Sequence, residues 1–336
     1  MKEFIEKLSR RQDLSTDEAS SAMRTIMEGG ATDAQIAGFL IALKFKGEHP
    51  DELLGFVRVM EEKSLKVRVE DPDAIDMCGT GGDGSGTFNI STVASFVVAG
   101  TGVTVAKHGN RSISSSCGSA DVLRSLGVRI DILPEKVETA INTVGIGFLF
   151  APLFHPAMKH AAKSRMELGV KTAFNLLGPM TNPAGVRRQL VGAFDHDAAD
   201  KVAAVFTARG MKKCFVVSSE DGLDEISLDA PTLIREVNGN TEVVQSEFHP
   251  APNGFRRIPK SSVQGGDAET NARIAMAILR GEIMPHRDYV VVNAAYGLLV
   301  AGAAPSLPEA VGLANESIDS GRALAKLEHL IEWTNA

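Results

Sequence analysis

The chain has 336 residues and a mass of 35.7 kDa, a length that predicts one large domain or two unequal ones. Hydrophobic residues make up 44% of it, charged residues 23%, and the mean hydropathy is +0.01. These values exclude disordered, fibrous and membrane-embedded chains. The formal net charge of −7 argues against nucleic-acid binding as the main function.

The cysteines and the N-terminal sequence indicate a cellular compartment. Cys78, Cys117 and Cys214 are too few and too scattered for a disulfide framework or a four-cysteine zinc site, which favours a reducing compartment. The chain begins with MKEFIEKLSRRQ, which lacks the apolar core of a signal peptide. No apolar run reaches the roughly 18 residues of a membrane span. We therefore expect a cytoplasmic protein with no membrane partner and no nucleic-acid partner.

Short helices are predicted over the first 65 or so residues. Ser15 with Glu18 and Thr32 with Gln35 fit capping boxes, and Pro50 suits the first turn of another helix. Apolar residues then recur at helical spacing, so each helix has one face to bury; they are Ile36, Phe39, Leu40, Leu43, Leu53, Leu54, Val57 and Met60. We expect a small helical domain over residues 1–70.

Strand and helix patterns alternate from residue 71 onward. The alternation predicts an α/β domain over residues 71–336, with a central, mostly parallel sheet flanked by helices. Buried strands are expected at 74–77, 103–106, 147–151 and 213–218. Helices are expected at 92–99, 120–126, 134–143, 156–168, 198–209 and 267–279, with a closing helical pair over 306–336.

A glycine-rich segment spans residues 79–92 and reads GTGGDGSGTFNIST. Its glycines let backbone amides approach an anion at the start of the following helix. Gly79, Gly81 and Gly84 spell the dinucleotide-binding fingerprint, but no acid for the ribose follows about 20 residues later. A P-loop spacing also occurs, but Thr87 stands where a lysine is required. The segment predicts a phosphate site of neither familiar type, with a purely structural loop as the alternative.

Further polar groups are expected at the same edge of the sheet. Asn89, Ser91 and Thr92 put an amide and two hydroxyls in the first turn of the helix, where they either cap it or contact phosphate. Residues 107–123 follow the next strand and read KHGNRSISSSCGSADVL, which suits a polyphosphate or a sugar phosphate if it is not simply a solvated loop. Because parallel strands end at one edge, both segments are expected to line one site.

Two adjacent acids, Asp224 and Glu225, lie in the segment EDGLDEIS at residues 220–227. Adjacent carboxylates are commonly just a charged turn. Beside a phosphate pocket, however, carboxylate oxygens are what Mg²⁺ takes when it also keeps waters and substrate oxygens. The metal interpretation therefore depends on the phosphate interpretation.

Arg165 begins the segment RMELGVKTAFNLLGPMTNPA at residues 165–184. The segment ends a helix near Gly169, and its Gly-Pro and Asn-Pro pairs predict turns. Arg165 is either a solvated charge at the helix end or a partner for a substrate carboxylate. Spacing alone does not identify a second substrate.

Together these segments resemble the anthranilate phosphoribosyltransferase family, which has the nucleoside phosphorylase-like glycosyltransferase fold. The motifs GTGGD with NIST, KHGNR with SSCGSADVL, FNLLGPMTNPA and DGLDEIS occur in the family's order, and the resemblance continues to SGRALAKLEHL near the end. It implies transfer of the 5-phosphoribosyl group of 5-phosphoribosyl 1-diphosphate (PRPP) to the amine of anthranilate, releasing diphosphate, as the second step of tryptophan biosynthesis from chorismate. It also implies two Mg²⁺ ions per subunit and a homodimer formed through the helical domain, which a returning segment near residues 165–190 joins.

The resemblance also implies roles for single residues. Ser91, Asp224 and Glu225 would hold magnesium. Gly79, Asn110 and Arg165 would meet anthranilate, with His108 and Pro179 as further neighbours and His108 as a possible base. PRPP would contact Gly79, Gly82, Asp83, Thr87, Asn89, Ile90, Ser91, Thr92, Lys107, His108, Gly109, Asn110, Arg111, Ser112, Ile113, Ser114, Ser115 and Ser119.

Two departures and two alternative functions accompany the resemblance. Ser218 and Ser219 stand where many members have His-Gly, and residues 228–230 read LDA in place of a small polar run. A pyrimidine nucleoside phosphorylase of the same fold would use free phosphate and need no paired metal carboxylates. A relative that binds nucleic acid would carry a positive net charge, which this chain does not.

Overall fold

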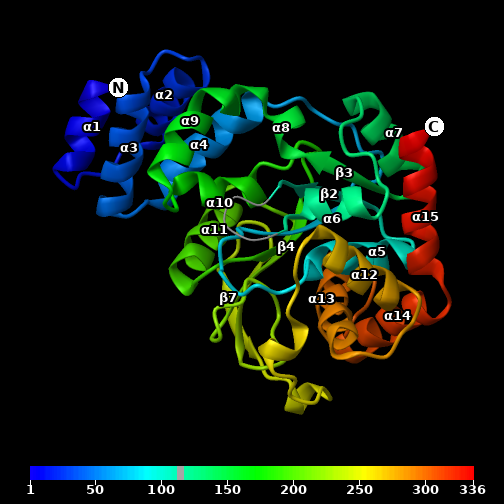
Figure 1. The fold of residues 1–336 in the computed structure, drawn as a ribbon. Helices are drawn as coiled ribbons and strands as arrows, with labels where there is room; N and C mark the ends of the chain where they lie inside the picture. The colour runs from blue at the N-terminus through cyan, green and yellow to red at the C-terminus, as the bar shows by residue number, and fades with distance from the viewer. Residues whose placement is uncertain (112–116) are drawn as a thin grey trace.

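The structure is a computed structural model that describes residues 1–111 and 117–336 (Figure 1). Its N-terminal domain contains α1 (Lys2–Ser9), α2 (Thr16–Met27), α3 (Asp33–Lys46) and α4 (Pro50–Glu62). Both expected capping boxes are present, at Ser15 with Glu18 and at Thr32 with Gln35. Each box pairs amides that the first helical turn leaves without partners. Pro50 begins α4, as predicted.

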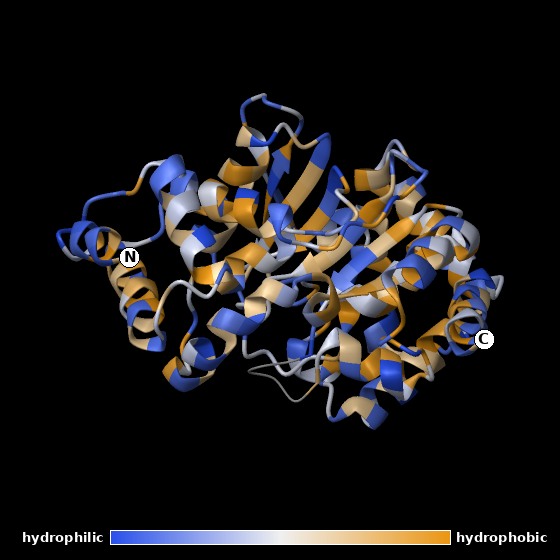
Figure 2. Ribbon diagram, turned by 90° about the horizontal axis from the view of Figure 1, so that it is seen from above, coloured by the Kyte–Doolittle hydropathy of each residue, from blue (hydrophilic) through white to orange (hydrophobic). Residues whose placement is uncertain are grey.

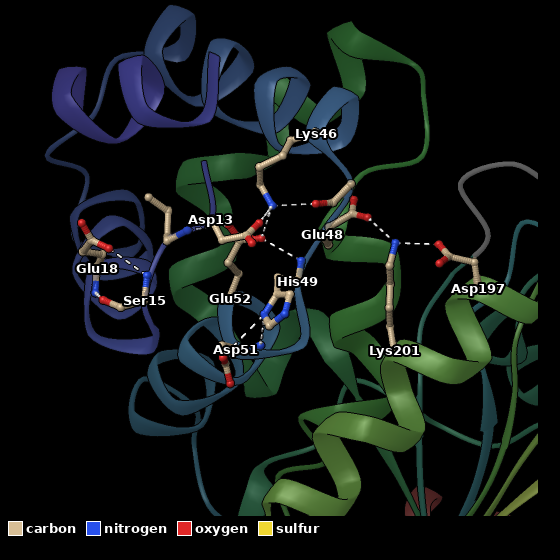
Figure 3. Close-up of polar contacts among 12 residues, drawn as sticks. Asp13, Ser15, Glu18, Lys46, Glu48, His49, Asp51, Glu52, Asp197 and Lys201 are labelled. Atoms are coloured by element: carbon tan, nitrogen blue, oxygen red, sulfur yellow. Dashed lines mark hydrogen bonds and ion pairs between the residues drawn. The ribbon is translucent and has the colours of Figure 1, made fainter. Parts of the chain in front are cut away.

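The helical domain packs against helices that come later in the chain. These are α9 (Lys159–Leu168), α10 (Ala173–Met180) and α11 (His196–Ala208), which share one hydrophobic cluster with it. Within the domain, the rings of Phe39 and Phe56 meet edge to face at 6.0 Å. An ion pair between Lys201 of α11 and Glu48, at 3.1 Å, adds a polar link between the two parts (Figure 3).

A seven-stranded sheet is the centre of the larger domain, and its strand order is β3-β2-β1-β4-β5-β6-β7. The pairs from β3 through β5 are parallel, and β6 and β7 are added antiparallel. The expected fold class is thereby confirmed. The strands are β1 (Ile75–Gly79), β2 (Val105–Gly109), β3 (Ile146–Phe150), β4 (Arg188–Gly192), β5 (Lys213–Ser219), β6 (Thr232–Val237) and β7 (Val244–Phe248).

Helices cover both faces of the sheet. One face packs on a cluster that includes α5 (Ile90–Gly100), α13 (Pro285–Ala301), α14 (Leu307–Asp319) and α15 (Arg322–Asn335). The other face packs on α10 and α11 with the helical domain. Figure 2 shows the hydrophobic colour on much of the central strands and in alternation with the hydrophilic colour along the surrounding helices. The remaining helices are α6 (Ser119–Ser125), α7 (Pro134–Val144), α8 (Ala151–Phe154) and α12 (Ala268–Leu279).

The helices mostly follow the sequence patterns. α5, α6, α7, α11 and α12 have ends within two residues of the expected ranges, whereas the range 156–168 is divided into a 3₁₀ turn at Pro156–Met158 and α9. The Gly-Pro pair was expected in a turn, but Pro179 lies within α10. It sits one residue before the helix ends, so its missing N–H removes one hydrogen bond from the last turn only. In the described part of the chain, no helix is long and apolar enough to cross a membrane.

Candidate active site

Two neighbouring strands bring the predicted phosphate segments together. β1 and β2 pair in parallel, so the loops that follow them lie at the same edge of the sheet. A cavity of about 300 Å³ opens there, lined also by the start of α5, by α10 and by the loop after β5. It is lined by every described residue that the resemblance assigns to a substrate or metal. Residues 112–115 of that assignment lie outside the described residues.

The loop between β1 and α5 has a backbone that favours glycine. Gly81, Gly82, Gly84 and Gly86 have φ values from 65° to 74°, in the left-handed region that other residues rarely adopt. Asn89 then precedes α5, and in the first turn of this helix the Ser91 amide bonds to the Glu225 side chain instead of a helical carbonyl. This arrangement of strand, glycine loop and helix start is suited to binding an anion through main-chain amides.

The acidic loop after β5 packs directly on this glycine loop. The Gly81 amide donates to Asp224 Oδ2 at 3.0 Å, and the Ser91 amide donates to Glu225 Oε1 at 3.0 Å. A Cβ at Gly79 would lie 2.5 Å from Asp224 Oδ2. Glycine at position 79 therefore lets the carboxylate approach the backbone. The two acids, 143 and 134 residues away from their amide partners along the chain, belong to the same site as the phosphate segments.

The carboxylates of this site are held away from bulk water without a balancing cation beside each of them. Desolvation, and after it the neighbouring charge of Asp83, raises the pKa of Asp224 to about 7. Desolvation and the charge of Asp224 raise the pKa of Glu225 to about 8, against the opposing effect of Lys107. Within the described part of the chain, Asp83 Oδ2 is buried with no hydrogen-bond partner. The site would gain from a bound cation.

Lys107 lies beneath the cavity on β2 and is 3% exposed. Its Nζ donates to the Met77 carbonyl at 2.6 Å, and desolvation lowers its pKa. The fully buried Asp76, on the adjacent strand, accepts hydrogen bonds from the His108 amide at 3.0 Å and from Asn182 Nδ2 at 2.8 Å. The polar floor of the site is therefore bonded across β1, β2 and the chain after α10.

His108 and His155 form a buried pair with ring centroids 5.2 Å apart. His108 Nδ1 lies 3.1 Å from the Gly178 carbonyl, and because a carbonyl only accepts, Nδ1 carries the proton. His108 Nε2 is then an acceptor, and it has no partner among the described residues. Desolvation lowers the pKa of His108 to about 3 and that of His155 to about 4. Both rings are neutral at pH 7, and His108 is a weak base there.

The side of the cavity expected to meet anthranilate combines a cation with an aromatic ring. The Arg165 guanidinium lies 5.0 Å from the centroid of Phe174, and desolvation lowers the pKa of Arg165. The Asn110 carbonyl accepts from Ser119 Oγ at 3.2 Å, which ties the KHGNR segment to the start of α6. An arginine withdrawn from water beside an aromatic face is suited to a planar carboxylate.

The donor set of the acidic loop fits magnesium. Asp224, Glu225 and Asp83 offer carboxylate oxygens and Ser91 a hydroxyl, and oxygen is the ligand atom that Mg²⁺ prefers. In the ranges that the structure describes, no three or more acidic, histidine or cysteine side chains are grouped as a complete metal site. Mg²⁺ commonly completes its coordination with water and substrate phosphates rather than with an all-protein cage.

Several residues of the site were missed by sequence reasoning. Phe174 and Asn175 line the cavity from α10, while Asp76 and His155 lie in its surroundings. Asp76 left one signal, since an acid inside an otherwise apolar strand must find buried donors. The others gave none, because their position depends on how α8 and α10 pack beside the sheet.

Comparison with known proteins extends over nearly the whole chain. The family model described as "Glycosyl transferase family, a/b domain" matches residues 71–324. The model described as "Glycosyl transferase family, helical bundle domain" matches residues 2–64.

Individual relatives agree with these models. The anthranilate phosphoribosyltransferase of Pelotomaculum thermopropionicum is 52% identical over 99% of this chain and 96% of its own length, and that of Syntrophobacter fumaroxidans is 51% identical over 98% of each. The crystal structure of the Thermus thermophilus enzyme superposes with a TM-score of 0.93 at 41% identity, covering 99% of both chains. The Saccharomyces cerevisiae enzyme in complex with PRPP and Mg has a TM-score of 0.90 at 27% identity, covering 99% of this chain and 97% of its own. The chain therefore belongs to the anthranilate phosphoribosyltransferase family.

Proposed function

We propose that the cavity at the ends of β1 and β2 is where this chain carries out its family's reaction. The reaction itself follows from membership of the family: the 5-phosphoribosyl group of PRPP passes to the amine of anthranilate, in the tryptophan pathway, and diphosphate leaves. What we propose is the distribution of this chemistry over the residues described above. The observation that carries it is the packing of Asp224 and Glu225 on the amides of Gly81 and Ser91.

PRPP is proposed to bind with its diphosphate over the glycine loop and the start of α5. Amides of the glycine loop that have no partner among the described residues would supply donors, and the KHGNR segment lines the same cavity. Breaking the bond from C1 to the diphosphate builds positive charge on the sugar and negative charge on the departing oxygens. Amides that are already oriented stabilise that negative charge without having to reorganise during the reaction.

Magnesium is proposed to be held by Ser91, Asp224 and Glu225, with two ions per subunit. When bound, it would neutralise charge on the diphosphate. The protein's part is to hold the two carboxylates in position through the Gly81 and Ser91 amides. A cation favours the charged form of carboxylates whose pKa is raised, so the metal would compensate for the desolvation and mutual repulsion of Asp224 and Glu225.

Anthranilate is proposed to bind on the other side of the cavity, where Arg165 would pair with its carboxylate and Asn110 and Gly79 would contact the ring amine side. His108 Nε2 is an acceptor without a described partner, and a weak hydrogen bond from the amine would orient its lone pair toward C1. An aromatic amine already has that lone pair, so orientation rather than deprotonation supplies much of the rate. The low pKa of His108, about 3, agrees with an orienting role better than with a base.

The protein is further proposed to form a homodimer through its helical domain. Residues 1–70 with the segment near 165–190 would form the dimerisation domain, and residues 71–336 the catalytic domain. Phe45 is 82% exposed on the helical domain, a large apolar side chain that a partner subunit would cover. Sedimentation at several concentrations tests the homodimer directly.

The activity is tested by the loss of anthranilate fluorescence when PRPP and Mg²⁺ are added, repeated with EDTA. We expect a fluorescence loss that requires PRPP and stops when EDTA removes the metal. If fluorescence is unchanged at high enzyme concentration, the proposal fails, and release of a base from a pyrimidine nucleoside with free phosphate becomes the next assay.

A further inference from the structure

Two buried asparagines on the C-terminal helices form hydrogen bonds to the glycine loop and the acidic loop from outside the cavity. Asn271 lies on α12 and is 2% exposed, and Asn293 lies on α13 and is fully buried. Neither lines the cavity. A buried amide side chain carries donors and acceptors that must be paired, so the identity of its partners indicates what it does.

Asn271 fixes the side chain of Asn89 at the start of α5. Asn89 Nδ2 donates to the Cys117 carbonyl at 3.2 Å, and Asn89 Oδ1 accepts from Asn271 Nδ2 at 3.1 Å. Asn271 Oδ1 in turn accepts from the Gly266 amide at 2.8 Å. A carbonyl at one end and an N–H at the other allow only one orientation of each amide group in this chain of bonds. Asn271, together with the backbone of Cys117, therefore fixes the orientation of the Asn89 side chain.

The segment before α12 is also pressed against the glycine loop. The Gly265 amide donates to the Gly86 carbonyl at 2.9 Å, and Gln264 pairs with Thr87 in an antiparallel bridge. A Cβ at Gly265 would lie 2.8 Å from the Phe88 backbone. Because Asn271 holds the next residue of this segment, it secures the glycine loop through a second route as well.

Asn293 holds the acidic loop in the same manner. Its Oδ1 accepts from the Ile226 amide at 2.9 Å, and its Nδ2 donates to the Ile226 carbonyl at 3.1 Å and to the Tyr289 carbonyl at 2.9 Å. Ile226 directly follows Glu225, whose carboxylate meets the Ser91 amide. The Asn293 side chain thus fixes both the backbone N–H and the backbone carbonyl of Ile226 to α13.

We propose that Asn271 and Asn293 are positioning residues for the transferase reaction, Asn271 for the diphosphate loop and Asn293 for the magnesium carboxylates. The inference rests on the proposed roles of these loops. Removing the Asn271 side-chain amide takes a donor from Asn89 and an acceptor from Gly266, and removing that of Asn293 takes the partner from the buried backbone of Ile226. In each case the loop is expected to shift to restore hydrogen bonds. Since each asparagine touches a different loop, the two are expected to affect different ligands.

The test compares Asn271→Ala with Asn293→Ala, each the matched control for the other because both lose the same buried side chain from a C-terminal helix. Initial rates are measured while PRPP is varied at saturating Mg²⁺, and again while Mg²⁺ is varied at saturating PRPP. Asn271→Ala is expected to raise the KM for PRPP about tenfold, with little change in the Mg²⁺ concentration that gives half the maximal rate. Asn293→Ala is expected to raise that Mg²⁺ concentration about tenfold.

A double-mutant cycle checks that Asn271 acts through Asn89. If it does, Asn89→Ala and Asn271→Ala raise the KM for PRPP less together than the product of their separate effects. Multiplicative effects, or variants that lose Tm while KM and the Mg²⁺ response stay unchanged, overturn the proposal. Should an alanine variant fail to fold, Asn271→Asp, which keeps the acceptor for Gly266 and loses the donor to Asn89, and Asn293→Ser take its place. Wild-type enzyme inactive in the same assay contradicts the proposed function itself, which separates the two failures.

Discussion

Two groups of acids that are shielded from water differ in how their charge is balanced. In the helical domain, Glu52 is fully buried and accepts from the Leu14 amide at 2.9 Å, the His49 amide at 2.8 Å and Lys46 Nζ at 2.9 Å (Figure 3). In the cavity, Asp224 and Glu225 accept hydrogen bonds from backbone amides. No cationic side chain of the described residues forms an ion pair with either acid. The charge of Glu52 is balanced by a cation within the protein, whereas the charges of Asp224 and Glu225 are not balanced in this way by any described residue.

The difference separates a structural site from a ligand site. Buried ion pairs are kept when every charge has its partners, and a site with unbalanced carboxylates loses stability unless something else supplies the opposite charge. Desolvation first, and the repulsion of neighbouring carboxylates second, raise the pKa of Asp224 to about 7 and that of Glu225 to about 8. Functional sites commonly retain such imbalance, because the ligand removes it.

Removing the structural acid should have the largest effect on stability. Glu52→Ala leaves Lys46, whose side chain is 4% exposed, without its fully buried partner, along with two unpaired amides. We expect a loss of about 3 to 5 kcal/mol in the free energy of unfolding, measured by urea denaturation. A loss no larger than that of a surface substitution would show that this network contributes little and would remove one side of the comparison.

Removing a metal acid should instead reduce turnover while the fold remains. Glu225→Ala is expected to lower kcat at least about 100-fold at saturating Mg²⁺, because the carboxylate is proposed to hold the metal that neutralises the leaving group. Glu220→Ala is the matched control: Glu220 lies in the same loop, is exposed and does not line the cavity. Unimpaired turnover of Glu225→Ala contradicts the metal assignment.

Acidification should lower the free energy of unfolding through the buried histidine pair. The pKa of His155 is lowered to about 4, against about 6.5 in an unfolded chain. The unfolded state therefore binds the proton more readily, so stability is fully present above pH 6.5 and falls as the pH drops toward 4. Between pH 7 and pH 5 the loss is about 2 kcal/mol for this residue.

The histidine effect is measured by denaturation of wild type and His155→Gln at both pH values. The variant should lose about 2 kcal/mol less on acidification. Equal losses in the two proteins would mean that His155 does not carry the acid sensitivity.

The smallest effect is expected at the rim of the helical network. Asp13 also pairs with Lys46, at 2.7 Å, but its side chain is 58% exposed. Asp13→Ala should cost less than about 1 kcal/mol, since Lys46 keeps Glu52 and water replaces Asp13. Denaturation alongside Glu52→Ala gives the comparison, and a cost as large as that of Glu52→Ala would show that burial does not distinguish the two acids.

The sequence predicted those parts of the fold and site that depend on local patterns. The capping boxes at Ser15 and Thr32 and the loops after β1 and β2 were expected because the spacing of a few neighbouring residues determines them. β4 begins with the polar residues Arg188 and Gln189, which hide the start of its short apolar run, and β7 is mostly exposed and shows none. Their existence depends on neighbouring strands, which no local pattern reveals.

The candidate site divides in the same way. Asp224 and Glu225 were singled out as adjacent acids, but their contact with Gly81 and Ser91 spans more than a hundred residues and follows from the sheet order. The sequence showed that Ser218 departs from the family pattern, but it did not show its partners. In the structure the Ser218 hydroxyl bonds to His196 Nδ1 at 2.6 Å and to Arg235 Nη1 at 2.7 Å. Such partners depend on packing between β5, β6 and α11 rather than on spacing.

The most direct test of the difference between the two acidic groups is calorimetric titration of PRPP into wild type and Glu225→Gln, each with and without Mg²⁺. Wild type should bind PRPP at least about tenfold more tightly with Mg²⁺ than without it, because the cation balances the negative charge of both the acidic loop and the diphosphate. Glu225→Gln should lose most of that Mg²⁺ dependence. Equal Mg²⁺ dependence in both proteins would contradict this assignment, because it would mean that the Glu225 carboxylate does not help to bind the Mg²⁺ that accompanies PRPP.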